Sequence, residues 1–87
     1  MKVTFLNYIK SIVMQAMIFL GVSPSPVTSK MEVNLNQAKL LLNTLILLQE
    51  KTDGNLTPQE SEVLRNAVDE LQVKYDEVLR LEEEFGG

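Results

Sequence analysis

The sequence contains no cysteine and no histidine. Without cysteine the chain has no disulfide, which is compatible with a reducing compartment. Without histidine it lacks the default general base, the commonest metal ligand and the usual sensor of pH near neutrality. Because enzymes of this size without either residue are uncommon, we expect a protein that is not an enzyme and that holds no cofactor and no metal.

The sequence also lacks an apolar run long enough to cross a membrane. Its longest run ends near Leu20 and covers about 16 residues, against the ~20 that a spanning helix needs. Lys10 and Gln15 interrupt this run, and no small-x-small cleavage pattern follows it. A secretory signal peptide is therefore disfavoured as well.

Basic residues are few and unevenly placed. Residues 1–44 contain four lysines against Glu32 alone, whereas residues 45–87 contain 4 basic and 11 acidic residues. The net charge of −4 thus combines a basic half with an acidic half, and the two halves attract each other. An acidic half repels a phosphate backbone and four scattered lysines form no stripe, so we expect no nucleic-acid partner.

Apolar residues make up 45% of the 87-residue chain. This length corresponds to one domain, residues 1–87, whose single core is only marginally sufficient on its own. Two segments, residues 5–20 and 35–48, are apolar around most of a helix's circumference rather than along one stripe. A chain this short cannot cover so much apolar surface internally. We therefore predict a homodimer, with another protein as the alternative partner.

The first helix is predicted over about residues 4–21, from an N-cap at Thr4 to a left-handed stop at Gly21. Met14 and Met17 lie on its apolar side, where core packing is the expected role and an adaptable contact surface is the alternative. The polar residues of this helix form one narrow stripe, made of Asn7, Lys10, Ser11 and Gln15.

A linker and two further helices follow. Residues 22–33 contain two prolines and no periodicity, so we expect an extended spacer of polyproline type. A capping box of Asn34 and Gln37 begins the second helix, and Gly54 ends it. Residues 57–60, Thr-Pro-Gln-Glu, then supply an N-cap, a first-turn proline and a second capping box for the third helix.

The predicted core faces of this helical hairpin, residues 34–85, follow helical spacing. The second helix contributes Leu35, Ala38, Leu41, Leu42, Leu45 and Leu48. Its polar side also carries two apolar residues without an evident intramolecular use, Ile46 and Leu47. The third helix contributes Leu64, Ala67, Val68, Leu71, Tyr75, Val78, Leu81 and Phe85.

The turn between these two helices partly matches a calcium-binding EF-hand loop. Aligning Gly54 with the glycine of that loop puts Asp53 and Glu60 at loop positions five and twelve. Positions one and three would then be Gln49 and Lys51, and a lysine ammonium cannot replace an oxygen ligand. A helix C-cap followed by a capping box explains the same residues, so we expect no calcium site.

Two other patterns indicate solvated segments rather than sites. The paired carboxylates of the third helix lie at i+1 spacing among solvent-facing positions, which is typical of a charged face. The terminal Gly86-Gly87 resembles the tail of ubiquitin-like carriers, but those tails leave a sheet and this chain offers no alternating strand. We expect a fraying tail.

Several sequence stretches, taken together, point to one family. They are Glu32-Val33-Asn34-Leu35, Ala38-Lys39, Leu48-Gln49-Glu50-Lys51-Thr52, Gly54-Asn55-Leu56-Thr57 with Glu60, and the ends of the first helix, Phe5-Leu6 and Phe19-Leu20-Gly21. Over about residues 4–79 the chain resembles the short bacterial proteins of domain of unknown function number eighteen forty-four. The resemblance implies a bacterial, cytosolic, all-helical protein. It transfers no catalytic residues, because the family has no established activity.

We therefore predict an all-α protein of three helices, a long αα-hairpin plus an apolar N-terminal helix, completed by homodimerisation. Its expected function is a non-enzymatic module for protein–protein interaction or oligomerisation. The alternative is a membrane-surface protein that uses its N-terminal helix, although interfacial helices usually carry several basic residues and this polar stripe has only Lys10. The candidate interface consists of Phe5, Tyr8, Ile12, Met17, Ile18, Phe19, Ile46 and Leu47.

Overall fold

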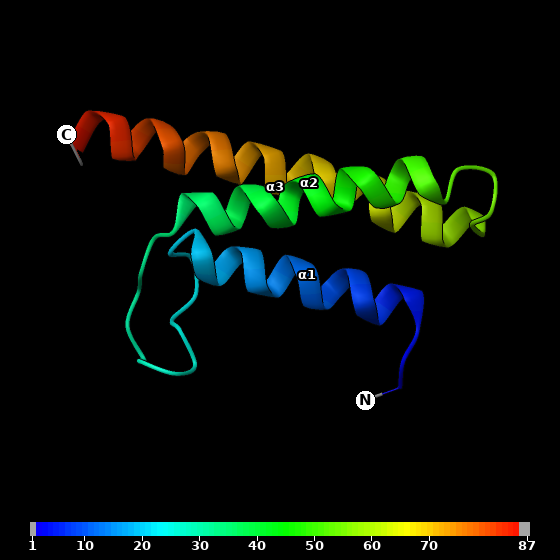
Figure 1. Cartoon of the computed structure of the whole chain (residues 1–87), viewed down its shortest axis with the longest axis horizontal. Coiled ribbons are helices and arrows are strands. Elements are labelled where there is room, and N and C mark those ends of the chain that lie inside the picture. Colours follow the sequence, from blue (N-terminus) through cyan, green and yellow to red (C-terminus); the bar gives the residue numbers. More distant parts are fainter. Residues whose placement is uncertain (1, 86–87) are drawn as a thin grey trace.

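The computed structural model describes residues 2–85, so the predicted fraying of Gly86-Gly87 lies outside the described residues. Three helices make up the fold: α1 (Phe5–Phe19), α2 (Leu35–Lys51) and α3 (Pro58–Phe85). Every pair of helices is in contact. α1 and α3 run in one direction and α2 runs in the other (Figure 1). Since residues 2–85 form no strand beyond a single bridge, the prediction of an all-α protein with three helices is confirmed.

Both ends of α1 are capped as the sequence predicts. The Thr4 hydroxyl oxygen accepts a hydrogen bond from the backbone N–H three residues later, at 3.1 Å. At the other end Gly21 has φ +75° and donates its N–H to the carbonyl of Ile18, at 3.1 Å. The N–H of the next residue, Val22, donates to the carbonyl of Met17 at 3.0 Å. This pair of bonds is a Schellman motif, which satisfies two carbonyls that the helix leaves free.

The turn from α2 to α3 is also built as predicted. Gly54 has φ +78°, a backbone conformation that favours glycine. The N–H of Glu60 donates to the Thr57 hydroxyl oxygen at 3.1 Å, and the N–H of Thr57 donates to the Glu60 carboxylate at 2.9 Å. This reciprocal pair is a complete capping box, and Pro58 occupies the first helical position, where a missing N–H costs nothing.

The linker between α1 and α2 differs from the predicted extended spacer, because its two ends are joined. The N–H of Asn34 donates to the carbonyl of Phe19 at 2.6 Å, and Leu20 forms a bridge with Val33. The Asn34 side chain still caps α2 by accepting from the N–H of Gln37 at 3.2 Å. The predicted capping box at this helix is therefore only half formed, since the N–H that Gln37 was expected to accept bonds to α1 instead.

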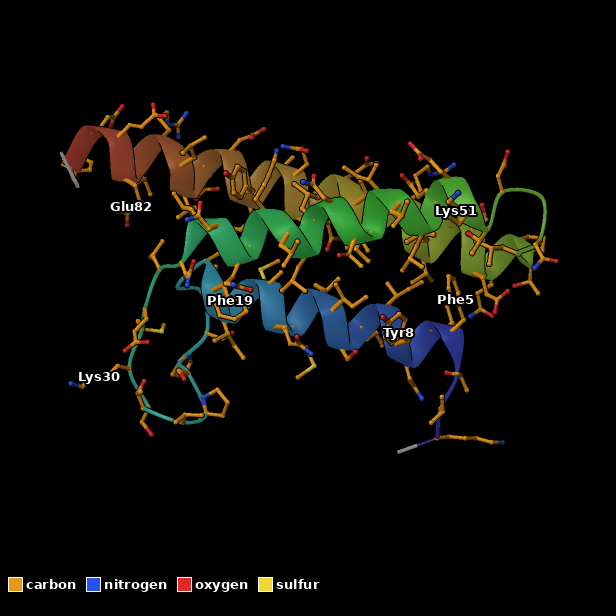
Figure 2. All side chains as sticks on the ribbon, viewed as in Figure 1. Phe5, Tyr8, Phe19, Lys30, Lys51 and Glu82 are labelled. Carbon is orange, nitrogen blue, oxygen red and sulfur yellow. The ribbon has the colours of Figure 1, made fainter. Side chains whose placement is uncertain are left out.

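The linker also turns within its own length. The N–H of Ser25 donates to the carbonyl of Lys30 at 2.9 Å, and the N–H of Ser29 donates to the carbonyl of Ser25 at 2.7 Å. Ser29 has φ +59°, which lets the chain reverse direction there. The segment is thus a closed loop that projects from one end of the helices, with the Lys30 side chain pointing away from them (Figure 2).

One hydrophobic core fills the space between the helices. The side chains predicted for the core face of α2 are all buried or packed against this core. Burying each large aliphatic side chain contributes about 1.5 to 3 kcal/mol before entropy costs, so this core is the main stabilising term. Its buried residues are Ile9, Ile12, Ala16 and Leu20, then Ala38, Leu42 and Leu45, then Leu64, Ala67 and Leu71.

The predicted core face of α3 is wrong at its C-terminal end. Val78 packs against the core, but Leu81 is 43% exposed and Phe85 is 81% exposed. The reason is length: a helix of 28 residues is about 42 Å long, whereas the 17 residues of α2 reach only about 25 Å. α3 alone therefore spans the 43 Å long axis of the molecule. We call residues 79–85, which extend past the start of α2 in Figure 1, the α3 overhang.

Candidate interaction surface

The molecule exposes more surface than a compact chain of its mass. Its accessible surface is 6106 Å², whereas about 5,200 Å² is expected for a compact monomer of 9.8 kDa. Its radius of gyration is 13.9 Å, against about 12 Å for a compact domain of this length. The surplus of about 900 Å² arises because the molecule is elongated, and part of it is apolar.

An apolar surface runs between α1 and α3, and we call it the α1–α3 groove. Two adjoining cavities of about 440 Å³ each share Glu70 and make up this groove. Met14 on α1 is 65% exposed and Val73 on α3 is 66% exposed, although both are large apolar side chains. The other apolar residues that line the groove are Ile9, Val13, Met17, Val63 and Ala67.

The rim of the groove carries charges of both signs. Lys10 stands on the α1 side, and Asp69, Glu70 and Glu77 stand on the α3 side. Lys74 forms an ion pair with Glu77 at 3.5 Å. Within residues 2–85 no ion pair involves Lys10, so its ammonium group is free to meet an incoming carboxylate. An apolar floor with a mixed-charge rim is the usual anatomy of a protein–protein contact.

The candidate residues predicted from the sequence do not form one surface. Ile12 is only 4% exposed and belongs to the core, so a partner cannot reach it in this fold. Met17 lines the α1–α3 groove. Ile18 and Phe19 line a separate cleft against the loop, where they lie beside Pro26.

The remaining candidates are distributed over the other faces. Phe5 and Ile46 are partly buried and pack against the core, so the expectation that Ile46 has no intramolecular use is wrong. Tyr8 is 51% exposed near the start of α1, and Leu47 is 50% exposed on α2. Of the two apolar residues on the polar side of α2, only Leu47 is exposed as predicted.

Sequence reasoning missed most of the groove. Val63 and Val73 lie outside the predicted core stripe of α3, so periodicity gave no reason to select them. Met14 and Met17 were expected to pack in the core, with a contact surface as the alternative, and Met17 was also a candidate interface residue. Their spacing of three residues on an apolar helix was the available signal for the groove. The groove could not be recognised without knowing how α3 is rotated against α1.

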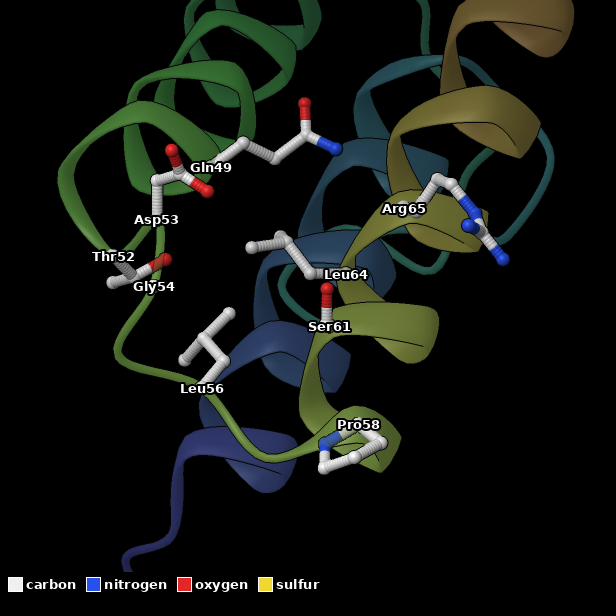
Figure 3. A pocket seen from close by; sticks show the side chains of 9 residues that line it. All are labelled: Gln49, Thr52, Asp53, Gly54, Leu56, Pro58, Ser61, Leu64 and Arg65. Carbon is white, nitrogen blue, oxygen red and sulfur yellow. The ribbon is translucent and has the colours of Figure 1, made fainter.

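A further cavity, of about 450 Å³, lies at the turn between α2 and α3 (Figure 3). Asp53 lies in the turn just after α2, and Arg65 points away from it (Figure 3). Glu60, the residue that an EF-hand would need as its last ligand, is held in the capping box. No group of three metal-ligating side chains comes together in the part of the chain that the structure describes. The predicted caps account for this turn, and nothing in the cavity indicates chemistry.

Comparison with known families decides where the chain belongs. The model of the family described as Domain of unknown function (DUF1844) matches residues 2–77. The chain belongs to this family. The DUF1844 match covers α1, α2 and the whole α1–α3 groove, and it ends before the α3 overhang. Neither the curated proteins nor the solved structures include a match to this chain. Among residues 2–85, no helix has the length and apolar character that crossing a membrane requires.

Proposed function

We propose that this DUF1844 protein is a non-enzymatic helical interaction module that forms a homodimer through its α1–α3 groove. The observation that carries the proposal is the pair Met14 and Val73, two large apolar side chains that are each about two-thirds exposed on facing walls of one groove. Methionine fits such a site, because its flexible thioether adapts to the surface that it meets.

Charge supports a second copy as the partner. In a twofold interface the same patch of each copy faces the other, and an axis parallel to the helices places α1 of one subunit against α3 of its partner. Such a pairing brings the basic α1 side of each groove, with Lys10, to the acidic α3 side of the other, with Asp69 and Glu70. The uneven charge of the sequence, basic in residues 1–44 and acidic in residues 45–87, favours the same arrangement.

The total exposed area is compatible with a dimer. A stable interface of standard size buries about 800 Å² on each partner. The chain exposes about 900 Å² more than a compact protein of its mass, and this surplus is spread over the whole elongated molecule. In this dimer α2 and α3 act as an antiparallel hairpin that holds α1 in place. Following the family resemblance, we assign the module to the bacterial cytoplasm.

A membrane-surface role is less well supported by the fold. A membrane-surface helix would have to insert its apolar face into the lipid. The apolar face of α1 is instead buried in the core, to which it contributes Ile9, Ile12 and Ala16. Lys10 is the only charged residue of α1, so the helix also offers little attraction to anionic headgroups.

A pair of charge-introducing variants tests the proposal. Met14→Glu and Val73→Glu each place a carboxylate in the groove at a site that is already exposed, so the folded chain should persist while the dimer dissociates. Leu40→Glu is the matched control, because Leu40 is 59% exposed on α2 and lies outside the groove. Sedimentation velocity of the three variants, with circular dichroism to verify folding, separates these outcomes. The proposed interface would be contradicted if the Leu40→Glu control were monomeric while both groove variants stayed dimeric.

A further inference from the structure

The α3 overhang continues the apolar face by which α3 packs in the core. Tyr75 and Val78 pack against the core, and Leu81 and Phe85 follow at helical spacing on the same side of the helix. Neither of these last two is covered, since they are 43% and 81% exposed. Within the overhang, α3 therefore has no neighbouring helix that covers its apolar face.

The geometry indicates what would cover this stripe. The earlier residues of the same apolar face of α3 already pack against other helices. A further helix lying along α3 would therefore cover Leu81 and Phe85 in the same way. The loop between α1 and α2 closes on itself through Phe19 and Asn34 at this end of the molecule. Neither α1 nor α2 reaches the overhang, because α1 ends at Phe19 and α2 begins at Leu35. Figure 1 shows the overhang extending past both of them.

The charge of the overhang indicates which kind of partner would bind to it. Residues 76–85 carry Asp76, Glu77 and the three glutamates Glu82 to Glu84, against the single cation Arg80. Among residues 2–85, no ion pair involves any of the three glutamates. They also lie in the last turns of α3, where the helix dipole disfavours negative charge. A sequence that places acids where they weaken its own helix has a local conflict, of the kind that proteins retain at functional sites.

We propose that the α3 overhang is the docking site for a basic amphipathic helix of a partner protein. The apolar face of that helix covers Leu81 and Phe85, and its lysines or arginines meet Glu82 and Glu84, which flank this pair on the helix surface. The overhang of a second copy does not fit, because two overhangs laid against each other would bring like charges together. The overhang lies beyond residue 77, where the family match ends, and it is separate from the groove proposed for dimerisation.

The test uses a synthetic helical peptide of about 15 residues, roughly four turns, with leucines on one face and lysines elsewhere. Fluorescence anisotropy measures its binding to the full-length chain. A peptide of the same composition in scrambled order, which has no apolar face, is the control for non-specific attraction to an acidic protein. We expect the amphipathic peptide to bind about tenfold more tightly than the scrambled one.

Two sets of variants localise the binding. Leu81→Ser combined with Phe85→Ser should weaken binding about tenfold, while Leu40→Ser, at a leucine of α2 that is 59% exposed, should not. Replacing Glu82, Glu83 and Glu84 by lysine keeps the apolar stripe and suits the helix dipole, so this variant should fold and still lose the basic peptide.

Three results would overturn the inference. They are equal binding of the amphipathic and scrambled peptides, wild-type affinity for the peptide in the Leu81→Ser/Phe85→Ser variant, and a variant that is monomeric where the wild type is a dimer. The groove variant Met14→Glu should bind the peptide as the wild type does. Failure of the dimer and failure of this docking site are thus measured separately.

Discussion

The backbone N–H of Asn34 donates to the carbonyl oxygen of Phe19 at 2.6 Å. This bond joins the N-cap of α2 to the last residue of α1, and it satisfies a donor and an acceptor that helix ends leave free. The bridge between Leu20 and Val33 lies directly beside it. The loop between the two helices is therefore closed at its base, and the angle at which α2 leaves α1 is fixed there.

The two left-handed glycines should respond differently to substitution by alanine. A Cβ at Gly21 would lie 2.9 Å from Cγ2 of Val33, whereas a Cβ at Gly54 would meet nothing within 4 Å. Both positions have positive φ, so Gly54→Ala should cost about 1 to 2 kcal/mol from the backbone alone. Gly21→Ala should cost about 2 to 3 kcal/mol, because the contact at the base of the loop adds strain. Urea unfolding at one fixed chain concentration measures both, and equal costs would argue against the closed loop.

The capping box at the start of α3 gives a second prediction. Thr57→Ala removes the hydroxyl that accepts from the N–H of Glu60, and it should lower the free energy of unfolding by about 1 kcal/mol. Thr57→Ser keeps this acceptor and serves as the control, with a much smaller loss. The same urea titration compares the two variants, and similar losses for both would mean that the hydroxyl is not the stabilising group.

Two leucines of α2 that lie two positions apart test the orientation of that helix. Leu42 is fully buried and Leu40 is 59% exposed. Leu42→Ala should therefore cost about 2 to 5 kcal/mol through lost burial and a cavity. Leu40→Ala should stay within about 0.5 kcal/mol, as is usual for surface substitutions. Thermal unfolding of the two variants under one buffer condition is sufficient, and a larger loss for Leu40→Ala would mean that α2 is rotated.

Flotation with liposomes tests the membrane-surface alternative. Because the apolar face of α1 is buried in the core, anionic vesicles should not carry the folded protein upward, even at low salt. Phe19→Glu is the informative variant, since a membrane binder would lose flotation on this change without losing its fold. Flotation of the folded wild type, abolished by Phe19→Glu, would favour the membrane-surface role over the interaction module.

Local features of this fold could be predicted from sequence, and relations between distant segments could not. The caps at Thr4 and Thr57 depend on residues three positions apart, so the sequence displays them directly. The core face of α2 follows from helical periodicity in the same way. The closed loop depends on a bond from Asn34 to Phe19, which no local pattern signals. Similarly, the exposure of Phe85 depends on the length of α3 relative to its neighbours.

The candidate interface shows the same division. Tyr8 was selected from the all-round apolar first helix and Leu47 as an apolar residue on the polar side of the second, and the structure leaves each about half exposed. Ile12 was selected on the same grounds as Tyr8 and lies in the core, because an all-round apolar helix does not reveal which side faces inward. Val73 was overlooked for the complementary reason, since it stands outside the regular stripe of α3.

The oligomeric state in solution tests the central claim most directly. Multi-angle light scattering of the wild-type chain, eluted from a size-exclusion column at micromolar concentration, should give twice the chain mass of 9.8 kDa. Met14→Glu and Val73→Glu should elute later with the mass of one chain and unchanged helicity. A wild-type mass of 9.8 kDa across the micromolar range would contradict the dimer, and with it the function proposed for the groove.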